Sequence, residues 1–417
     1  MDRMTIRTLR MTALGFVLSS SAHAQAMRKL TPVPEVRIGA QQLGAQREMI
    51  VALSPDGRLV VAPRFGNMPI IAFDSLGKQL PLKILVGGGN SAEILSPVRL
   101  GWIAGTQTMW VADQGYRQIV LVDSSGKVFK TIENPSWIHP SWAERRKFPV
   151  FASMQAFGVY KDETMLLLPG RERALLDTPG YDRSGQHLLR ATWSGGIQRS
   201  VTMLPDDRER LVFRAKGCDR AVTLPFGAHA LWTVSSDGSR IVTATSGASG
   251  ADSGVVRVTS IGERGDTIFS RTIAQPAVRV PQTTVDNVLA TQRACGSFTP
   301  EAIRDSISRR VTPFKSFIAE LLASGDQTTW VTLHAAADTS TERTTIGLDE
   351  RGEIIGAVSL PANEMVVAAD RSHLWTTQVP RARMPAAIVR YRLDAIAAPQ
   401  PRSGRGGSPS NTSRPPE

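Results

Sequence analysis

The stretch Thr108-Met-Trp-Val-Ala-Asp-Gln-Gly-Tyr-Arg-Gln-Ile-Val-Leu-Val-Asp-Ser-Ser-Gly-Lys127 decides the fold. It reads as a strand, a polar turn, a second strand and a tight turn. Met109–Ala112 and Ile119–Val122 are apolar runs of the kind found in buried strands. Asp123 opens the tight turn because its carboxylate can accept bonds from the backbone ahead, and Gly126 closes it because a positive φ costs glycine little.

This unit recurs along the chain with drift. Apolar tetrads comparable to Met109–Ala112 begin at positions 59, 165, 241, 329 and 374. The second run and its turn recur in Ile70–Lys78 and Thr345–Glu353, and a drifted turn in Gly262–Asp266. Further strands before and after complete units of four. Where no insertion interrupts it, the period is about 45 to 50 residues, as in propeller blades.

The sequence therefore predicts an all-β fold, a six-bladed β-propeller with four-stranded antiparallel blades. The last blade lacks an outer strand after Tyr391–Asp394, and Val36–Gly39 is expected to supply it and close the ring. Residues 283–311 break the β pattern and predict a short helical insertion between blades 4 and 5, with Thr299 as a helix cap before Pro300. Blade 3 lacks a clean Asp-x-x-Gly turn, so its boundaries stay open.

The repeat resembles a known type. Pro97 to Lys127, with Met109–Asp113, Arg117 and Val122–Gly126, resembles an NHL-type repeat. Residues 35–395 resemble the exported six-bladed β-propeller proteins of bacteria, and Val311–Lys315 before Gly325–Val331 resembles the blade junction of that group. The resemblance implies the fold and, because its residues are structural, little about activity.

The amino-terminal sequence predicts export. Arg3, Arg7 and Arg10 precede the apolar run Met11–Leu18, and Ala22-His-Ala24 follows, so residues 1–24 are expected to be a cleavable signal peptide; an uncleaved arm is the alternative. We expect no lipid anchor, because no Cys follows the run, and no transmembrane segment, because no apolar stretch is long enough. We expect a periplasmic or secreted protein with a propeller over residues 25–397 and a disordered basic tail over 398–417.

Two cysteines, Cys218 and Cys295, are the only ones in the chain. In an exported protein an even count predicts a disulfide, here between distant segments.

The net charge is +12. Each chain end, 1–24 and 398–417, has three Arg and one acid and contributes +2, which leaves +8 for residues 25–397. A basic surface favours anionic partners. A general preference of this protein for surface Arg would give the same total.

Long connections are expected to gather on one face. The loops between strands 1 and 2 and between 3 and 4 are tight turns, and they define what we call the turn face. Nearly all long insertions fall in the other connections, which open on the opposite, loop-rich face, where binding residues are expected. Candidate ligand-binding residues on or beside it are Arg64, Arg117, Arg171, Arg173, Arg343, Arg381, Arg383, Trp137 and Trp142. Arg binds carboxylate or phosphate through paired hydrogen bonds, and Trp can stack on a sugar or base.

Alternatives remain for these residues. The arginines could pair with local acids, such as Asp113 with Arg117 or Glu342 with Arg343. Trp137 and Trp142 could pack as a lid against the propeller rim.

Catalytic signatures are absent: there is no Gly-x-Ser-x-Gly and no His-Glu-x-x-His. We therefore expect no catalytic residues, no cofactor and no metal site in a monomeric binding module for an anionic glycan or an envelope protein, without specific nucleic-acid recognition. The alternative is a lactonase-like or lyase-like hydrolase with one divalent metal such as Ca²⁺ in the central channel. Six-bladed lactonases hold their metal with Glu, Asn and Asp, and Glu48, Asn90 and Asp113 could take these parts.

Overall fold

The computed structural model describes residues 27–44, 48–64, 69–84, 86, 94–133, 154–169, 185–194, 196–205, 210–216, 218–224, 226, 229–248, 253–310, 314, 316–334, 340–378 and 387–395. The predicted signal peptide and the basic tail lie outside these residues.

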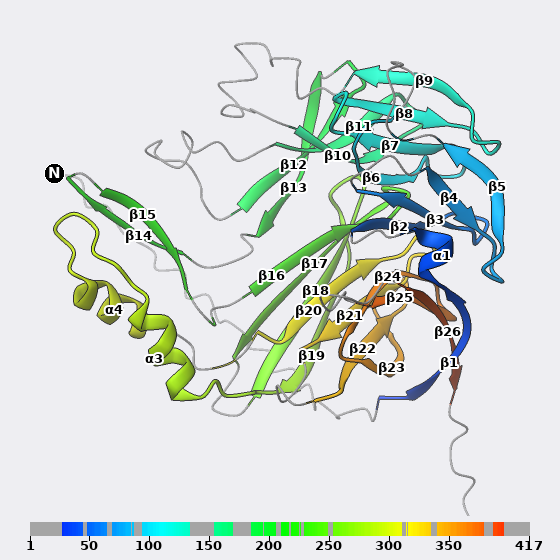
Figure 1. The fold of residues 1–417 in the computed structure, drawn as a ribbon. Helices are drawn as coiled ribbons and strands as arrows, with labels where there is room; N and C mark the ends of the chain where they lie inside the picture. The colour runs from blue at the N-terminus through cyan, green and yellow to red at the C-terminus, as the bar shows by residue number, and fades with distance from the viewer. Residues whose placement is uncertain are drawn as a thin grey trace, which may run out of the picture.

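Small, mostly antiparallel sheets follow one another around a ring, which is the arrangement of a β-propeller (Figure 1). Four of them have four strands in chain order, and we call them blades 1 to 4. Blade 1 is β2 to β5 (Met49–Leu53, Leu59–Pro63, Ile70–Phe73, Gln79–Ile84), and blade 2 is β6 to β9 (Pro97–Trp102, Met109–Asp113, Gln118–Val122, Val128–Glu133). Blade 3 is β10 to β13 (Met154–Val159, Thr164–Pro169, Gly185–Thr192, Ile197–Pro205), and blade 4 is β16 to β19 (His229–Val234, Arg240–Ala248, Ser253–Gly262, Thr267–Pro276).

The fifth sheet has eight strands and includes the N-terminal strand β1 (Lys29–Ile38). Its order is β20-β21-β22-β23-β1-β26-β25-β24. β1 pairs antiparallel with β26 from Leu30 to Ile38 and touches β23 through two parallel pairs. The other strands are β20 to β23 (Ile318–Ala323, Thr329–Leu333, Glu342–Leu348, Ile354–Pro361) and β24 to β26 (Glu364–Ala369, His373–Gln378, Ile388–Ala395).

The apolar tetrads form the second strands, and their side chains fill the spaces between neighbouring sheets. Every residue of β3, β7 and β21 is buried. Trp110, Trp330 and Trp375 are 1% exposed. Separate apolar clusters lie between blades 1 and 2, 2 and 3, 3 and 4, and between blade 4 and β20–β22. The core is thus a series of wedges, which is why both faces of these strands are apolar.

The tight turns behave as their residues predict. Asp74, Asp123 and Asp349 each accept two backbone N–H bonds, from residues two and four positions ahead, at 2.9–3.0 Å. The closing glycines have φ of 75°, 89° and 82°. A Cβ on Gly77 would lie 2.4 Å from Val36 of β1, and one on Gly126 would lie 2.4 Å from Leu82 of β5. Each glycine therefore also packs against a strand of another sheet.

Blade 3 is a complete four-stranded sheet, although its sequence left its boundaries open. Its first turn has no glycine, and Glu163 takes the left-handed conformation at φ 58°. Tyr160 opens this turn, and Asp162 accepts bonds from Thr164. In the turn between β12 and β13, where the Asp-x-x-Gly pattern is missing, the Thr192 hydroxyl takes the place of the Asp carboxylate and accepts from the Gly196 amide at 2.9 Å.

Arginine side chains link neighbouring sheets at the turn face. Arg190 of β12 packs 3.3 Å over the ring of Tyr160, bonds Asp162 and lies 3.8 Å from Glu263 of blade 4. Arg240 of β17 donates to the backbone oxygens of Gln327 and Glu350. Arg390 of β26 donates to the Ser75 oxygen of blade 1 at 2.7 Å. Part of the basic composition is therefore used to hold the ring together.

Helices are few. α1 (Ala40–Leu43) follows β1, and α3 (Gln282–Ala290) and α4 (Pro300–Ser308) lie between β19 and β20, where a short helical insertion is predicted. The Thr299 side chain accepts from the Ala302 amide as the predicted cap. None of the helices among the described residues has the length and apolar character needed to span a bilayer.

Candidate binding face

Most of the predicted ligand-binding residues lie outside the described residues. They are Trp137, Trp142, Arg171, Arg173, Arg381 and Arg383. Their role stays a prediction.

The other three arginines are placed. Arg64 lies 3.2 Å from Glu48, with both side chains exposed. Arg343 lies 3.0 Å from Glu320, a less exposed pair that links β22 to the inner strand β20. Arg117 occupies the turn between β7 and β8 with φ 60°. Arg64 and Arg343 thus each pair with an acid, as the alternative interpretation predicts. The partner of Arg343 is Glu320, 23 positions away, and not its neighbour Glu342.

One turn closes the ring axis at the turn face. Residues 235–238, the axial turn, connect β16 to β17 of blade 4. The Ser236 oxygen accepts from the Trp102 amide of blade 2 at 2.8 Å, and the Gly238 oxygen accepts from the Tyr160 hydroxyl of blade 3 at 2.7 Å. The Ser236 hydroxyl oxygen would lie 3.2 Å from a Cβ on Gly325, which follows β20. Because blades 2 and 4 are not neighbours, this turn must reach across the axis.

Glycine permits this crossing. A Cβ on Gly101 of β6 would lie 2.2 Å from the Ser236 oxygen, and one on Gly158 of β10 would lie 3.1 Å from the Gly238 Cα. Only a residue without a side chain allows the backbones to approach this closely. The axis is therefore filled at the turn face, and the inner strands lead toward the loop-rich face.

Above the axial turn, three inner strands contribute a stacked group. The Arg99 guanidinium of β6 lies 3.6 Å from the centroid of the Phe157 ring of β10. Phe157 in turn packs on Trp232 of β16, with centroids 4.8 Å apart and planes at 45°. Phe157 is buried, while Arg99 and Trp232 are half-buried. Burial lowers the pKa of Arg99 to about 10.

The inner strand β20 contributes a carboxylate, Glu320. Its oxygens accept from Arg343 and from the Val366 amide of β24, both at 3.0 Å. Burial raises the pKa of Glu320, although the Val366 bond and the Arg343 charge act in the opposite direction. Glu320 is thus a structural residue whose carboxylate is compensated by Arg343 and the Val366 amide.

The second feature of the loop-rich face is a separate unit that we call the disulfide lobe, residues 210–224 and 277–310. It consists of the ribbon β14 (Arg210–Ala215) and β15 (Cys218–Thr223) with α3 and α4, and it stands apart from the ring (Figure 1). It has its own core, which includes Phe213, Val222, Ile303 and Ile307. Its two segments enter on either side of blade 4.

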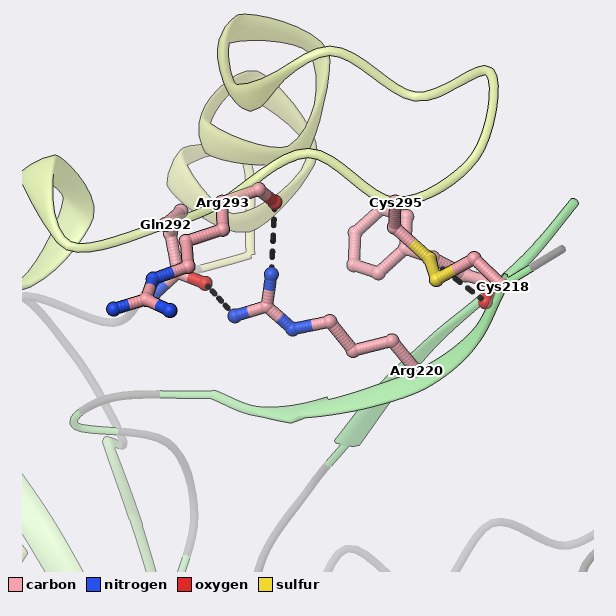
Figure 2. Close-up of a disulfide and its surroundings, with 6 residues drawn as sticks. Cys218, Arg220, Gln292, Arg293 and Cys295 are labelled. Carbon is pink, nitrogen blue, oxygen red and sulfur yellow. Dashed lines mark hydrogen bonds between the residues drawn. A yellow bond between two sulfur atoms is a disulfide. The ribbon is translucent and has the colours of Figure 1, made fainter.

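The predicted disulfide joins these two segments. Cys218 and Cys295 are bonded, with Cα atoms 5.4 Å apart and a separation of 77 positions in the sequence. Figure 2 shows Arg220 of β15 reaching to the segment between α3 and α4, where it donates to the Arg293 oxygen at 2.8 Å and to the Gln292 side chain at 3.2 Å. Gly296 has φ 56° and lies against Ala215 and Lys216.

The residues considered for a metal have other contacts. The Asp113 carboxylate is buried and accepts from the amides of Leu95, Ser96 and Gly115. Glu48 pairs with Arg64, and Asn90 lies outside the described residues. Over the described ranges, no three His, Cys, Asp or Glu side chains come together in a group that could hold a metal ion.

Sequence reasoning missed Arg99, Phe157, Trp232 and the axial turn. Arg99 lies inside a predicted strand, and nothing nearby in the sequence shows that its neighbours come from two other blades. The pattern did carry one signal, a charged residue in the inner strand β6.

The sequence matches no known family profile and no curated protein. Its fold is similar to solved structures. A member of the DUF4221 family from Bacteroides vulgatus has a TM-score of 0.45 and 12% identity over 89% of this chain and 100% of that chain. Virginiamycin B lyase from Staphylococcus aureus has a TM-score of 0.38 and 10% identity over 86% and 98%. The calcium-binding protein regucalcin from Agrobacterium tumefaciens has a TM-score of 0.34 and 9% identity over 89% and 98%. The function of this chain is therefore inferred from its own residues.

Proposed function

We propose that this chain is an exported, non-catalytic six-bladed propeller that binds an acidic polysaccharide on its loop-rich face through the disulfide lobe. The observation that carries the proposal is the distribution of charge. The lobe has nine Arg or Lys against four Asp or Glu, a net +5 of the +8 on residues 25–397. A small unit thus concentrates most of the positive charge, and an anion is attracted to that unit first.

The exposed cations of the lobe support this role. Arg214, Lys216, Arg293, Arg309 and Arg310 are exposed, and Arg220 is held in place by oxygens that carry no formal charge. Glu301 pairs with Arg304 and so offsets only one of the cations. The aromatic rings of the described lobe are buried or half-buried, so stacking with nucleic-acid bases is disfavoured.

Export is supported by two features of the chain. Disulfides persist in oxidising compartments, and Cys218 and Cys295 are bonded. The first 24 residues have the pattern of a signal peptide. Acidic glycans belong to the same compartments, which favours them over nucleic acid as the partner.

The number of blades is part of the proposal. We assign β20–β23 as blade 5, and β24, β25, β26 and β1 as blade 6, with β1 as its outer strand. The contact of Gly77 with Val36 of β1 repeats that of Gly126 with Leu82 of β5, and Gly265 and Gly352 contact β13 and β19 in the same way. Arg390 also joins β26 to blade 1. A ring of six closed by its N-terminal strand accounts for all of these contacts.

Charge reversal in the lobe tests the function. The triple variant Lys216→Glu, Arg293→Glu, Arg309→Glu should elute from immobilised heparin, and from immobilised polygalacturonate, at about half the salt concentration of the native protein or less, because the attraction is screened by salt. The control variant Lys78→Glu, Lys127→Glu, Arg351→Glu makes the same change in net charge at exposed residues of the turn face. It should elute close to the native protein. Equal elution of the two variants would show that only net charge matters and would overturn the proposal.

The alternative is a metal-dependent hydrolase with its site on the axis. It would require Glu48 and Asp113 to release their present partners, or other groups to join them. Metal analysis of the purified protein decides this question, since a stoichiometric Ca²⁺ or Zn²⁺ would favour the hydrolase.

A further inference from the structure

We infer that the inner edge of the ring holds a second site, separate from the lobe, in which Arg99 binds the carboxylate of a small organic acid and Trp232 packs against the body of that ligand. The two side chains come from β6 and β16, and Phe157 of β10 lies between them. The site is independent of the proposed polysaccharide binding.

The first argument is the state of the Arg99 guanidinium. It stacks on Phe157, and within the described part of the chain no hydrogen bond and no carboxylate contact engages its five N–H groups. Stacking occupies the flat face of a guanidinium but leaves its N–H groups free at the edge, where a carboxylate binds in a paired fashion. Burial lowers its pKa, because the charged form is disfavoured where little water reaches the group.

Arg190 provides the comparison inside the same molecule. It also stacks on an aromatic ring, that of Tyr160 at 3.3 Å. Its Nε and Nη2 groups, however, donate to Thr164 and to both oxygens of Asp162, while its buried Nη1 lies 3.8 Å from Glu263 without a hydrogen bond. A stacked, buried arginine that serves the framework is thus supplied with acceptors, whereas Arg99 is supplied with none by the described residues.

The second argument is the shape of the surroundings. The axial turn fills the axis below the stacked group through its bonds to Trp102 and Tyr160. Arg99 lies three positions before Trp102 on β6, and Trp232 lies four positions before Ser236. A ligand would therefore approach from the loop-rich face and would rest above the axial turn.

Charge decides the class of ligand. Arg99 is the one arginine or lysine on the inner strands β2, β6, β10, β16, β20 and β24, and Glu320 and Glu364 lie on the same set of strands. Both acids already have hydrogen-bond partners. A single cation matches a monoanion, whereas a dianionic phosphate would remain undercompensated. The half-buried Trp232 adds an apolar surface suited to an aromatic or sugar body.

Stability measurements test the site without knowledge of the ligand. Met has a similar length to Arg and can pack on an aromatic ring. If Arg99 serves a ligand and not the framework, Arg99→Met should leave the Tm unchanged or raise it, because the variant removes a half-buried charge that has no acceptor among the described residues. Arg190→Met should lower the Tm by several degrees, because Asp162 loses its partner. An equal loss of Tm in both variants would make Arg99 a framework residue and would overturn the inference.

Binding measurements test the ligand class. Calorimetric titration with benzoate and with galacturonate should show saturable binding of at least one to the native protein, while benzamide and inorganic phosphate should not saturate. Arg99→Gln should weaken carboxylate binding by about tenfold or more, and Arg99→Lys should lie between because it cannot bind in a paired fashion. The lobe variant with three reversed charges should bind the same carboxylate as the native protein, so the two sites can fail separately. No saturable binding of either carboxylate, or equal binding by Arg99→Gln, would overturn the inference.

Discussion

At the residue scale, the same chemical group has opposite roles according to its partners. Arg190 and Arg99 are both stacked on aromatic rings of blade 3, yet one is surrounded by acceptors and the other is not. The sequence identifies both as arginines in strands and cannot separate them, because the acceptors of Arg190 lie 26 and 28 positions away. Pairing is a tertiary property, which the sequence alone does not show.

The Arg190–Asp162 contact makes stability depend on pH. Burial alone would raise the pKa of Asp162, but bonds from Thr164 and the charge of Arg190 outweigh it and lower the pKa. A carboxyl group with a lowered pKa in the folded state stabilises the protein above its unfolded pKa of about 3.9 and loses that effect as the pH falls further. We expect the Tm difference between the native protein and Asp162→Asn to shrink as the pH is lowered from 6 toward 3, measured by thermal unfolding. A constant difference would mean that the carboxylate charge contributes nothing.

At the scale of single elements, the tight turns could be predicted from sequence, but their second role could not. Asp74–Gly77 and Asp123–Gly126 fold as expected, and the glycine is required by its φ. The structure adds that Gly77 lies against β1 and Gly126 lies against β5, which are strands of other sheets. The ribbon β14–β15 could not be predicted in this way, because its residues match no repeat.

Gly265 and Gly57 allow the conformational role of a turn glycine to be measured separately from its contact with another strand. Gly265 has φ 90° and its Cβ would lie 2.3 Å from the Val201 backbone oxygen of β13, whereas Gly57 has φ 82° with nothing within 4 Å. Gly57→Ala should cost about 1 kcal/mol from conformation alone. Gly265→Ala should cost about 3 kcal/mol, since the turn must also move away from β13. Chemical denaturation of both variants measures the difference, and equal losses would show that the contact between blades contributes nothing.

At the scale of the whole molecule, the ring was the most predictable feature. Its repeat is visible in the sequence as the apolar tetrads that begin at positions 59, 109, 165, 241, 329 and 374. Each tetrad forms the second strand of a sheet or of one half of the eight-stranded sheet. The axial turn and the disulfide lobe depend on contacts between segments that lie more than 70 positions apart in the sequence. Examples are Ser236 with Trp102 and Cys218 with Cys295. Local patterns carry no information on such contacts.

Closure of the ring by β1 can be tested by removing it and giving it back. Ile38 is fully buried and Leu30 is 8% exposed, so deletion of residues 27–38 exposes apolar surface and leaves β26 with an unpaired edge. We expect the Tm to fall by roughly 10 °C and aggregation to increase. A synthetic peptide of residues 27–38 should restore the Tm by pairing with β26, as donor strands do, and a peptide with Ile38→Asp should not. Deletion of residues 402–417 serves as the control and should leave the Tm unchanged. An unchanged Tm after loss of β1 would show that the ring does not depend on its N-terminal strand.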